Sequence, residues 1–263
     1  MQETVKVASV EQPKPIYPSN LVLLPSKGSL YPEDHPLRAG KVDMKFMTAK
    51  EENILTTESY IKDGSVIDKF LQSMIMAPKF DYDDLLIGDK DALIIASRIY
   101  GYGEHYDIKV TAPSGREQSV SINLSELEHK EVDESLYVNG NEFSYKTPLG
   151  GNLLQFKLLT VGDQKAIDSK LKKYRKSGSA DTQITTRLCH MITAVDGNSD
   201  PMFIKLFVEN ELRAPDSRSF REYVSSIQFG INMDIELIDE DTGEPFRRSI
   251  AIGPDFFWPD ARI

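Results

Sequence analysis

Cysteine is nearly missing from this chain of 263 residues, in which Cys189 stands alone. A single thiol excludes an intramolecular disulfide and a zinc site built from several cysteines. The four histidines, at positions 35, 105, 129 and 190, do not follow the i, i+4 spacing of metal-binding helices. Neighbouring side chains on a helix point about 100° apart, so Cys189 and His190 cannot act as nucleophile and base. We expect a buried, structural cysteine.

Long apolar runs are missing as well. Stretches such as Leu-Ile-Ile-Ala-Ser at 93–97 are far shorter than the roughly 20 residues of a membrane span. The opening MQETVKVASVEQPKP lacks the continuous apolar region of a secretory signal. The sequence therefore predicts a soluble protein that is made in the cytoplasm and does not bind a membrane.

Basic residues are outnumbered by acidic ones, 31 against 41, which gives a net charge of -10. Such a chain repels phosphate backbones, which argues against nucleic acid as the main ligand. The glycine-rich, nucleophile-elbow and phosphate-loop motifs are absent, and Gly101-Tyr102-Gly103 follows a predicted helix, where it cannot cradle a phosphate. We expect no enzyme activity, no catalytic residue and no cofactor.

Hydrophobic residues, at 40%, are close to the globular average, so a real core is expected. Helical and alternating patterns follow one another, which predicts an α+β fold. The sequence divides into an extended N-terminal arm (1–28), a mainly helical segment (29–104), a β-rich segment (105–161), a helical bundle (162–230) and a C-terminal β-hairpin with an aromatic tail (231–263).

Helix starts are marked by capping signals. Thr48 and Glu51 form a capping box, and Asp89 after Gly88 reads as the cap of a helix that ends near Tyr100. Farther on, the spacing predicts four helices: 163–176, 181–194, one from Pro201, and one over 214–227.

Strands are predicted where apolar and polar residues alternate. Two hairpins are expected, one joining 106–110 to 120–124 and one joining 233–237 to 246–252. The turn Asn139-Gly140 predicts a third, between 136–138 and 143–145, and 153–161 is typical of a single strand. Whether the terminal hairpin joins the middle sheet is left open.

Two acidic clusters raise the alternative of a metal-dependent hydrolase. The first, Asp81 to Asp91, fits helix starts, where the helix dipole favours acids. The second, 239–243, lacks the regular oxygen donors and the distal glutamate of a calcium loop. We predict no metal ligand in either cluster.

Three features suggest contacts with partner proteins. The arm is interrupted by the apolar run 21–24, so it is either disordered or ordered against a neighbouring surface. A basic run on the helix 163–176 is either a solvated helix end or a docking site for an acidic partner. The aromatics at 256–258 either fill the core or anchor a partner. The candidate partner-binding residues are Leu21, Leu23, Lys172, Lys173, Arg175, Phe257 and Trp258.

The ending Phe256-Phe-Trp-Pro259 resembles that of the baseplate hub and hub-assembly proteins of T-even-like (T4-like) contractile-tailed phages. Further matching stretches occur in the family's order along the chain; they are 24–28 with Tyr31-Pro32, 47–55, 85–89, 98–103, and 214–217 with Arg221.

The resemblance implies a structural or assembly protein of the contractile tail, assembled in the host cytoplasm, with other baseplate or tail proteins, or copies of itself, as partners. A chaperone of hub or tail assembly that does not remain in the virion is the alternative. Relatives carry cysteine pairs in two hairpin turns, as in a zinc knuckle, whereas here the turns read Ala112-Pro-Ser-Gly115 and Asp239-Glu-Asp-Thr-Gly243. If these hairpins pack together, they do so without metal.

Overall fold

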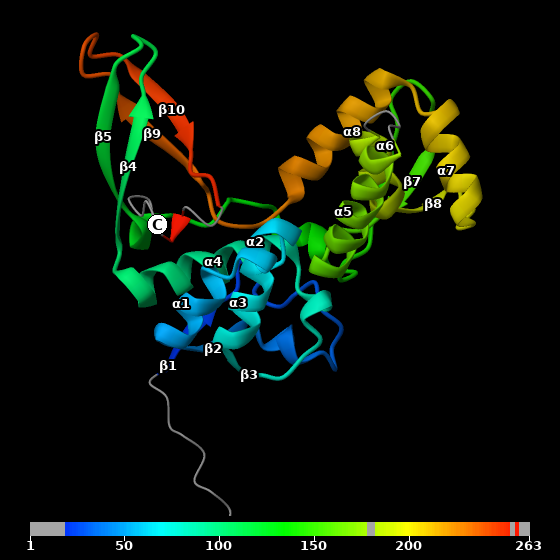
Figure 1. The fold of residues 1–263 in the computed structure, drawn as a ribbon. Helices are drawn as coiled ribbons and strands as arrows, with labels where there is room; N and C mark the ends of the chain where they lie inside the picture. The colour runs from blue at the N-terminus through cyan, green and yellow to red at the C-terminus, as the bar shows by residue number, and fades with distance from the viewer. Residues whose placement is uncertain (1–18, 178–181, 253–255, 258–263) are drawn as a thin grey trace, which may run out of the picture.

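The computed structural model describes residues 19–177, 182–252 and 256–257. Within them the fold is α+β, as predicted, with eight α-helices and four antiparallel sheets of two or three strands. Figure 1 shows an N-terminal lobe, two β-hairpins that project from it side by side, and a helical lobe on the other side. None of the helices described has the combination of length and apolar character that a membrane span requires.

The N-terminal lobe packs helices against a sheet of order β1-β2-β3. Its elements are β1 (Ser19–Leu23), β2 (Lys41–Lys45), α1 (Ala49–Leu55), α2 (Glu58–Asp63), α3 (Val66–Met74), β3 (Ile75–Ala77) and α4 (Ile87–Tyr102), with the 3-10 turns η1 (Pro36–Ala39) and η2 (Tyr82–Asp84). Thr48 and Glu51 form the predicted capping box, and the buried Glu51 carboxylate accepts a 2.7 Å hydrogen bond from Lys45 Nζ. This ion pair fixes α1 to the end of β2.

Two expectations for this lobe differ from the structure. Residues 19–28, assigned to the arm, belong to the lobe, because β1 pairs with β2 from Ser19 to Leu23. The remaining arm residues, 1–18, lie outside the described part of the chain. Helix α4 begins at Ile87 and continues through Gly88, and Asp89 lies inside the helix rather than at its cap.

The two projecting hairpins are those predicted. They are β4 (His105–Thr111) with β5 (Glu117–Asn123), and β9 (Asp234–Ile238) with β10 (Pro245–Ser249). They form two separate sheets of two strands each. Side-chain contacts join them, because Gln118 Nε2 donates to the backbone oxygen of Ile238 at 2.9 Å.

The helical lobe surrounds a sheet of order β6-β7-β8. Its elements are β6 (Phe143–Lys146), β7 (Leu153–Phe156), α5 (Val161–Lys176), α6 (Gln183–Met191), β8 (Ile192–Val195), α7 (Pro201–Asn210) and α8 (Ala214–Ile227). The turns η3 (Leu124–Glu126) and η4 (Glu134–Tyr137) lie between the β4–β5 hairpin and this lobe in the chain.

Several sequence predictions for the helical lobe are wrong in detail. Residues 134–137 form η4, not a strand, because Tyr137 is buried and its hydroxyl donates to the Ile227 oxygen at 2.6 Å. The strand expected at 153–161 ends at Phe156, and α5 is capped by Thr160, with Asp163 as the third residue of the capping box. Residues 192–195 leave the helical pattern to pair with β7.

Candidate interaction surfaces

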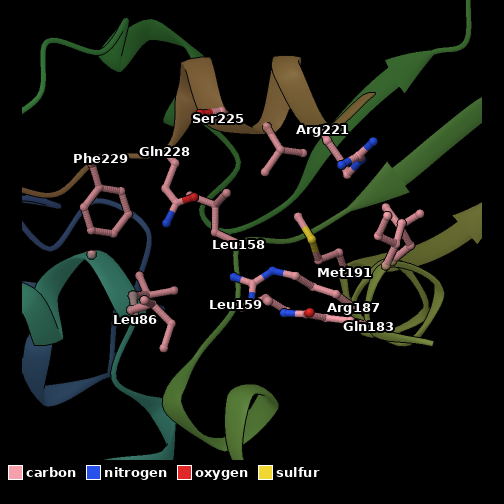
Figure 2. Close-up of a pocket in the computed structure, with 15 residues that line it drawn as sticks. Leu86, Leu158, Leu159, Gln183, Arg187, Met191, Arg221, Ser225, Gln228 and Phe229 are labelled. Atoms are coloured by element: carbon pink, nitrogen blue, oxygen red, sulfur yellow. The ribbon is translucent and has the colours of Figure 1, made fainter. Parts of the chain in front are cut away.

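A cavity of about 260 Å³ lies where the N-terminal and helical lobes meet. Figure 2 shows side chains from the start of α4, from 158–159, from α6 and from the end of α8 converging on it. Most of the lining is apolar, and it comprises Leu86, Ile87, Leu158, Leu159, Ile184, Leu188, Met191, Val224 and Phe229. One wall depends on a glycine, because a Cβ on Gly88 would lie 2.4 Å from the Phe229 oxygen.

Two arginines add positive charge to this apolar lining. Arg187 extends from α6 toward Leu159, and Arg221 comes from α8 (Figure 2). Arg187 Nη1 donates to the neutral Gln164 Oε1 at 3.0 Å, and burial lowers the pKa of its guanidinium while nearby Asp168 acts to raise it. Among the described residues, neither arginine forms an ion pair with a carboxylate. The cavity therefore suits an apolar group next to an anion.

Of the candidate partner-binding residues, the three on α5 are exposed. Lys172 Nζ also donates to the backbone oxygen of Asp63, so part of its hydrogen-bonding capacity holds α5 against the N-terminal lobe. Lys173 lies with Lys172 along a surface groove between α5 and the α2–α3 turn. The basic run thus combines an internal contact with exposed charge.

Leu21 and Leu23 lie on β1 with 55% and 66% of their surface exposed, whereas Val22 between them is buried. In the described part of the chain β1 pairs with β2 alone, so it forms one edge of its sheet. The structure therefore places both candidate leucines on an open edge strand.

The structure describes two of the three C-terminal aromatics, and both lie in the core. Phe257, expected at a partner surface, is 1% exposed and packs edge-to-face on Phe70 with ring centroids 4.9 Å apart. Its side chain is a core contact in this structure, which is the first of the two alternatives given for the aromatics at 256–258. Phe256 is equally buried against Tyr106, and Trp258 lies outside the described residues.

The tips of the two hairpins meet around the Asp239 carboxylate. It accepts hydrogen bonds from Ser114 N at 3.0 Å and Ser114 Oγ at 2.9 Å, across the interface, and from Asp241 N at 3.0 Å within its own turn. Arg116 adds ion pairs to Asp241 and Glu240. A carboxylate with its hydrogen-bond donors therefore joins the turns of the two hairpins.

This arrangement predicts a pH-dependent contribution to stability. Burial acts to raise the pKa of Asp239, but hydrogen bonds from Asp241, Ser114 and Thr242 outweigh it and hold the pKa below the ordinary 3.8. A lowered pKa stabilises the fold above the ordinary value, and this stabilisation is lost as pH falls through the folded-state pKa. Asp239→Asn should therefore melt below the unaltered protein at neutral pH, with a gap that shrinks below about pH 4.

Melting curves across a pH series measure that gap. The exposed Asp234→Asn, on the same hairpin, is the matched control and should change the melting temperature little, as surface substitutions do. A constant difference for Asp239→Asn from neutral to acidic pH would contradict the assignment.

The acids considered as metal ligands are dispersed in the structure. Asp81 caps η2, Asp83 pairs with Lys165, and Asp89 is buried against Ser26 and Tyr31. Within the described ranges, no group of three histidine, cysteine, aspartate or glutamate side chains is placed to hold a metal ion.

Residues 19–149 match the model of a protein family described as T4 bacteriophage base plate protein. The chain belongs to this family. As a T4-type baseplate protein it has a structural role in the phage tail, is located in the virion tail, and interacts with other baseplate proteins. No curated protein and no solved structure matches the chain.

The part of this baseplate protein that matches the family includes the N-terminal lobe and the β4–β5 hairpin. The cavity lies at its border, since α4 lies within the match while α6 and α8 lie beyond it. Sequence reasoning missed Arg187 and Arg221 as site residues. Each occupies an ordinary polar position of an amphipathic helix, and only the packing of α6 and α8 against α4 brings them to one apolar cavity.

Proposed function

We propose that this protein is a subunit of the baseplate hub that acts by binding other baseplate proteins and catalyses no reaction. The cavity between the lobes is the observation that supports binding most directly. Its volume of about 260 Å³ falls below the roughly 300–1,000 Å³ of small-molecule sites. It has room for one large apolar side chain from a partner, a common form of interface anchor.

The chemistry of the lining defines the partner further. Arg187 and Arg221 line the apolar cavity, and neither forms an ion pair with a carboxylate among the described residues. An incoming apolar anchor with an adjacent aspartate or glutamate would supply the carboxylate for such an ion pair. A partner segment that carries an apolar residue next to an acid fits both properties. Lys172, Lys173 and Arg175 on α5 would contact an acidic surface nearby, at the rim of the interface, where charges mainly steer association.

Ile184 allows a direct test, because it lines the cavity and is 52% exposed. Ile184→Asp places a charge in the anchor site without emptying the core. We expect incorporation into tails to fall at least about tenfold, the effect of losing about 1.4 kcal/mol of binding. The measurement is quantitative mass spectrometry of tails purified from phage that carry the variant.

The matched control is Ile61→Asp, since Ile61 is a helical isoleucine of similar exposure, 43%, on α2. It should melt and be incorporated like the unaltered protein. Equal incorporation of both variants would contradict docking at the cavity. A different result would identify an assembly chaperone instead of a hub subunit. In that case tails assemble only when the gene is present, but the purified tails do not contain the protein.

A further inference from the structure

Strand β1 has one edge whose backbone groups bond to none of the residues that the structure describes. In the β1–β2 register Leu24 lies opposite Gly40, and Leu24 N donates to the Gly40 oxygen at 2.9 Å. Residues of an antiparallel ladder alternate between facing the partner strand and facing away from it. Leu24 and Val22 therefore bond toward β2, whereas the N–H and C=O groups of Ser19, Leu21 and Leu23 face away from it. Within the described residues no hydrogen bond to these outward groups is recorded.

The side chains of this edge are unusual for a strand in water. Proteins normally protect an open edge with lysine, proline, a bulge or a covering segment. Here β1 reads Ser-Asn-Leu-Val-Leu, and its two exposed side chains on the outer face are Leu21 and Leu23. The same residues thus offer free backbone groups and exposed apolar area. This combination is the one that an added β-strand recognises.

The segment that precedes β1 contains a matching strand sequence. Residues 4–10, Thr-Val-Lys-Val-Ala-Ser-Val, are rich in β-branched residues, and Val5 and Val7 flank Lys6 with the period of two that strands use. Its valines would lie beside Leu21 and Leu23 on the outer face of the sheet. Residues 4–10 contain no proline, so every residue can donate to the ladder.

The spacer between this segment and β1 favours a second copy over the same chain. Residues 11–18, Glu-Gln-Pro-Lys-Pro-Ile-Tyr-Pro, contain three prolines. Proline-rich sequences favour an extended, semi-rigid backbone at about 3.1 Å per residue, so eight residues of this composition can reach roughly 25 Å. Folding back on β1 instead requires the two strands to come within about 5 Å of each other. The composition of the spacer therefore favours pairing of residues 4–10 with a neighbouring copy over pairing with their own chain.

We propose that residues 4–10 of one copy pair as an added strand with β1 of a neighbouring copy. The arms then link copies of the protein side by side, with Leu21 and Leu23 covered by the valines of the neighbour. This inference deepens the proposed function and rests on it, since such links join copies within the baseplate. It uses a surface distinct from the cavity that receives another baseplate protein.

Amide hydrogen exchange of the full-length protein tests the pairing without altering the fold. The outward amides of Leu21 and Leu23 should exchange about tenfold more slowly at the top of a concentration series than at its bottom, as pairing worth about 1.4 kcal/mol requires. The double variant Val5→Pro, Val7→Pro removes two donors from the arm and should abolish this protection. Gln12→Pro, in the spacer, is the control and should leave it unchanged.

Each other outcome overturns the inference. Fast exchange of both amides at every concentration means that no segment of this protein covers β1, which leaves the edge for a different protein. Protection that does not depend on concentration means that the arm folds on its own chain. Protection that survives Val5→Pro, Val7→Pro means that another segment is the occupant. Incorporation of the Ile184→Asp variant into tails is measured separately, so a failure of arm pairing and a failure of the proposed function remain distinguishable.

Discussion

An Asp89→Ala variant melts about 6–12 °C below the unaltered protein, because about 3 kcal/mol of stability is lost in a chain of this size. The Asp89 carboxylate is fully buried and accepts hydrogen bonds from Ser26 N at 3.0 Å, Ser26 Oγ at 2.7 Å and the Tyr31 hydroxyl at 2.7 Å. The same tyrosine oxygen accepts from Leu86 N at 3.0 Å. One side chain therefore fixes the loop after β1 to the first turn of α4.

Alanine at this position leaves three donors facing a cavity, and each unsatisfied buried donor costs about 1–3 kcal/mol. Asp34→Ala is the control, since Asp34 is an exposed aspartate in the loop between β1 and β2. It should change the melting temperature little, as surface substitutions do. Equal melting temperatures for the two variants would show that the network around Asp89 adds no stability.

The same group predicts a pH effect of opposite sign to that of Asp239. Burial raises the pKa of Asp89 to about 6, against the opposing effect of its hydrogen bonds from Ser26 and Tyr31. A raised pKa stabilises the fold most below the ordinary value, and that contribution is lost as pH rises through about 6. Melting temperatures of Asp89→Ala and of the unaltered protein should differ most at the acidic end of this window.

Asp89 also shows which interactions cannot be predicted from the sequence. Its position after Gly88 suggested a helix cap, which is a local interpretation. In the structure its partners lie 58 and 63 residues earlier in the chain. Thr48 and Glu51, by contrast, form the predicted capping box because both partners lie within one turn. Local signals are reliable when the whole interaction is local.

The strands show the same difference between local and long-range interactions. The hairpins β4–β5 and β9–β10 were predictable, since alternation and a turn lie within one continuous stretch. Residues 192–195 continue a helical pattern, yet they form β8 because β7 offers a free edge some 40 residues earlier in the chain. The cavity is less predictable still, because its lining comes from segments of both lobes that only tertiary packing brings together.

The C-terminal aromatics are the second place where a large effect is expected. Phe256 and Phe257 pack edge-to-face on each other, with centroids 5.6 Å apart, between Tyr106 of β4 and Phe70 of α3. Arg98 of α4 holds the segment, since its Nε donates to the Phe256 oxygen at 3.2 Å and its Nη1 to the Gly103 oxygen at 3.2 Å. The end of the chain thus closes the junction between the N-terminal lobe and the hairpins.

Phe257→Ala should therefore destabilise the isolated protein by about 3–5 kcal/mol, the usual cost of emptying a buried phenylalanine site. For a chain of this length that corresponds to a fall in melting temperature of about 6–20 °C. Phe203→Ala is the matched control, because Phe203 lies on α7 with 38% of its surface exposed and has less contact to lose. If Phe257→Ala instead melts like Phe203→Ala while its incorporation into tails fails, the segment is not held in the core and serves a partner. A large fall in melting temperature for Phe257→Ala alone means that the packing of this ring on Phe70 of α3 and on Phe256 holds the C-terminal segment in the core.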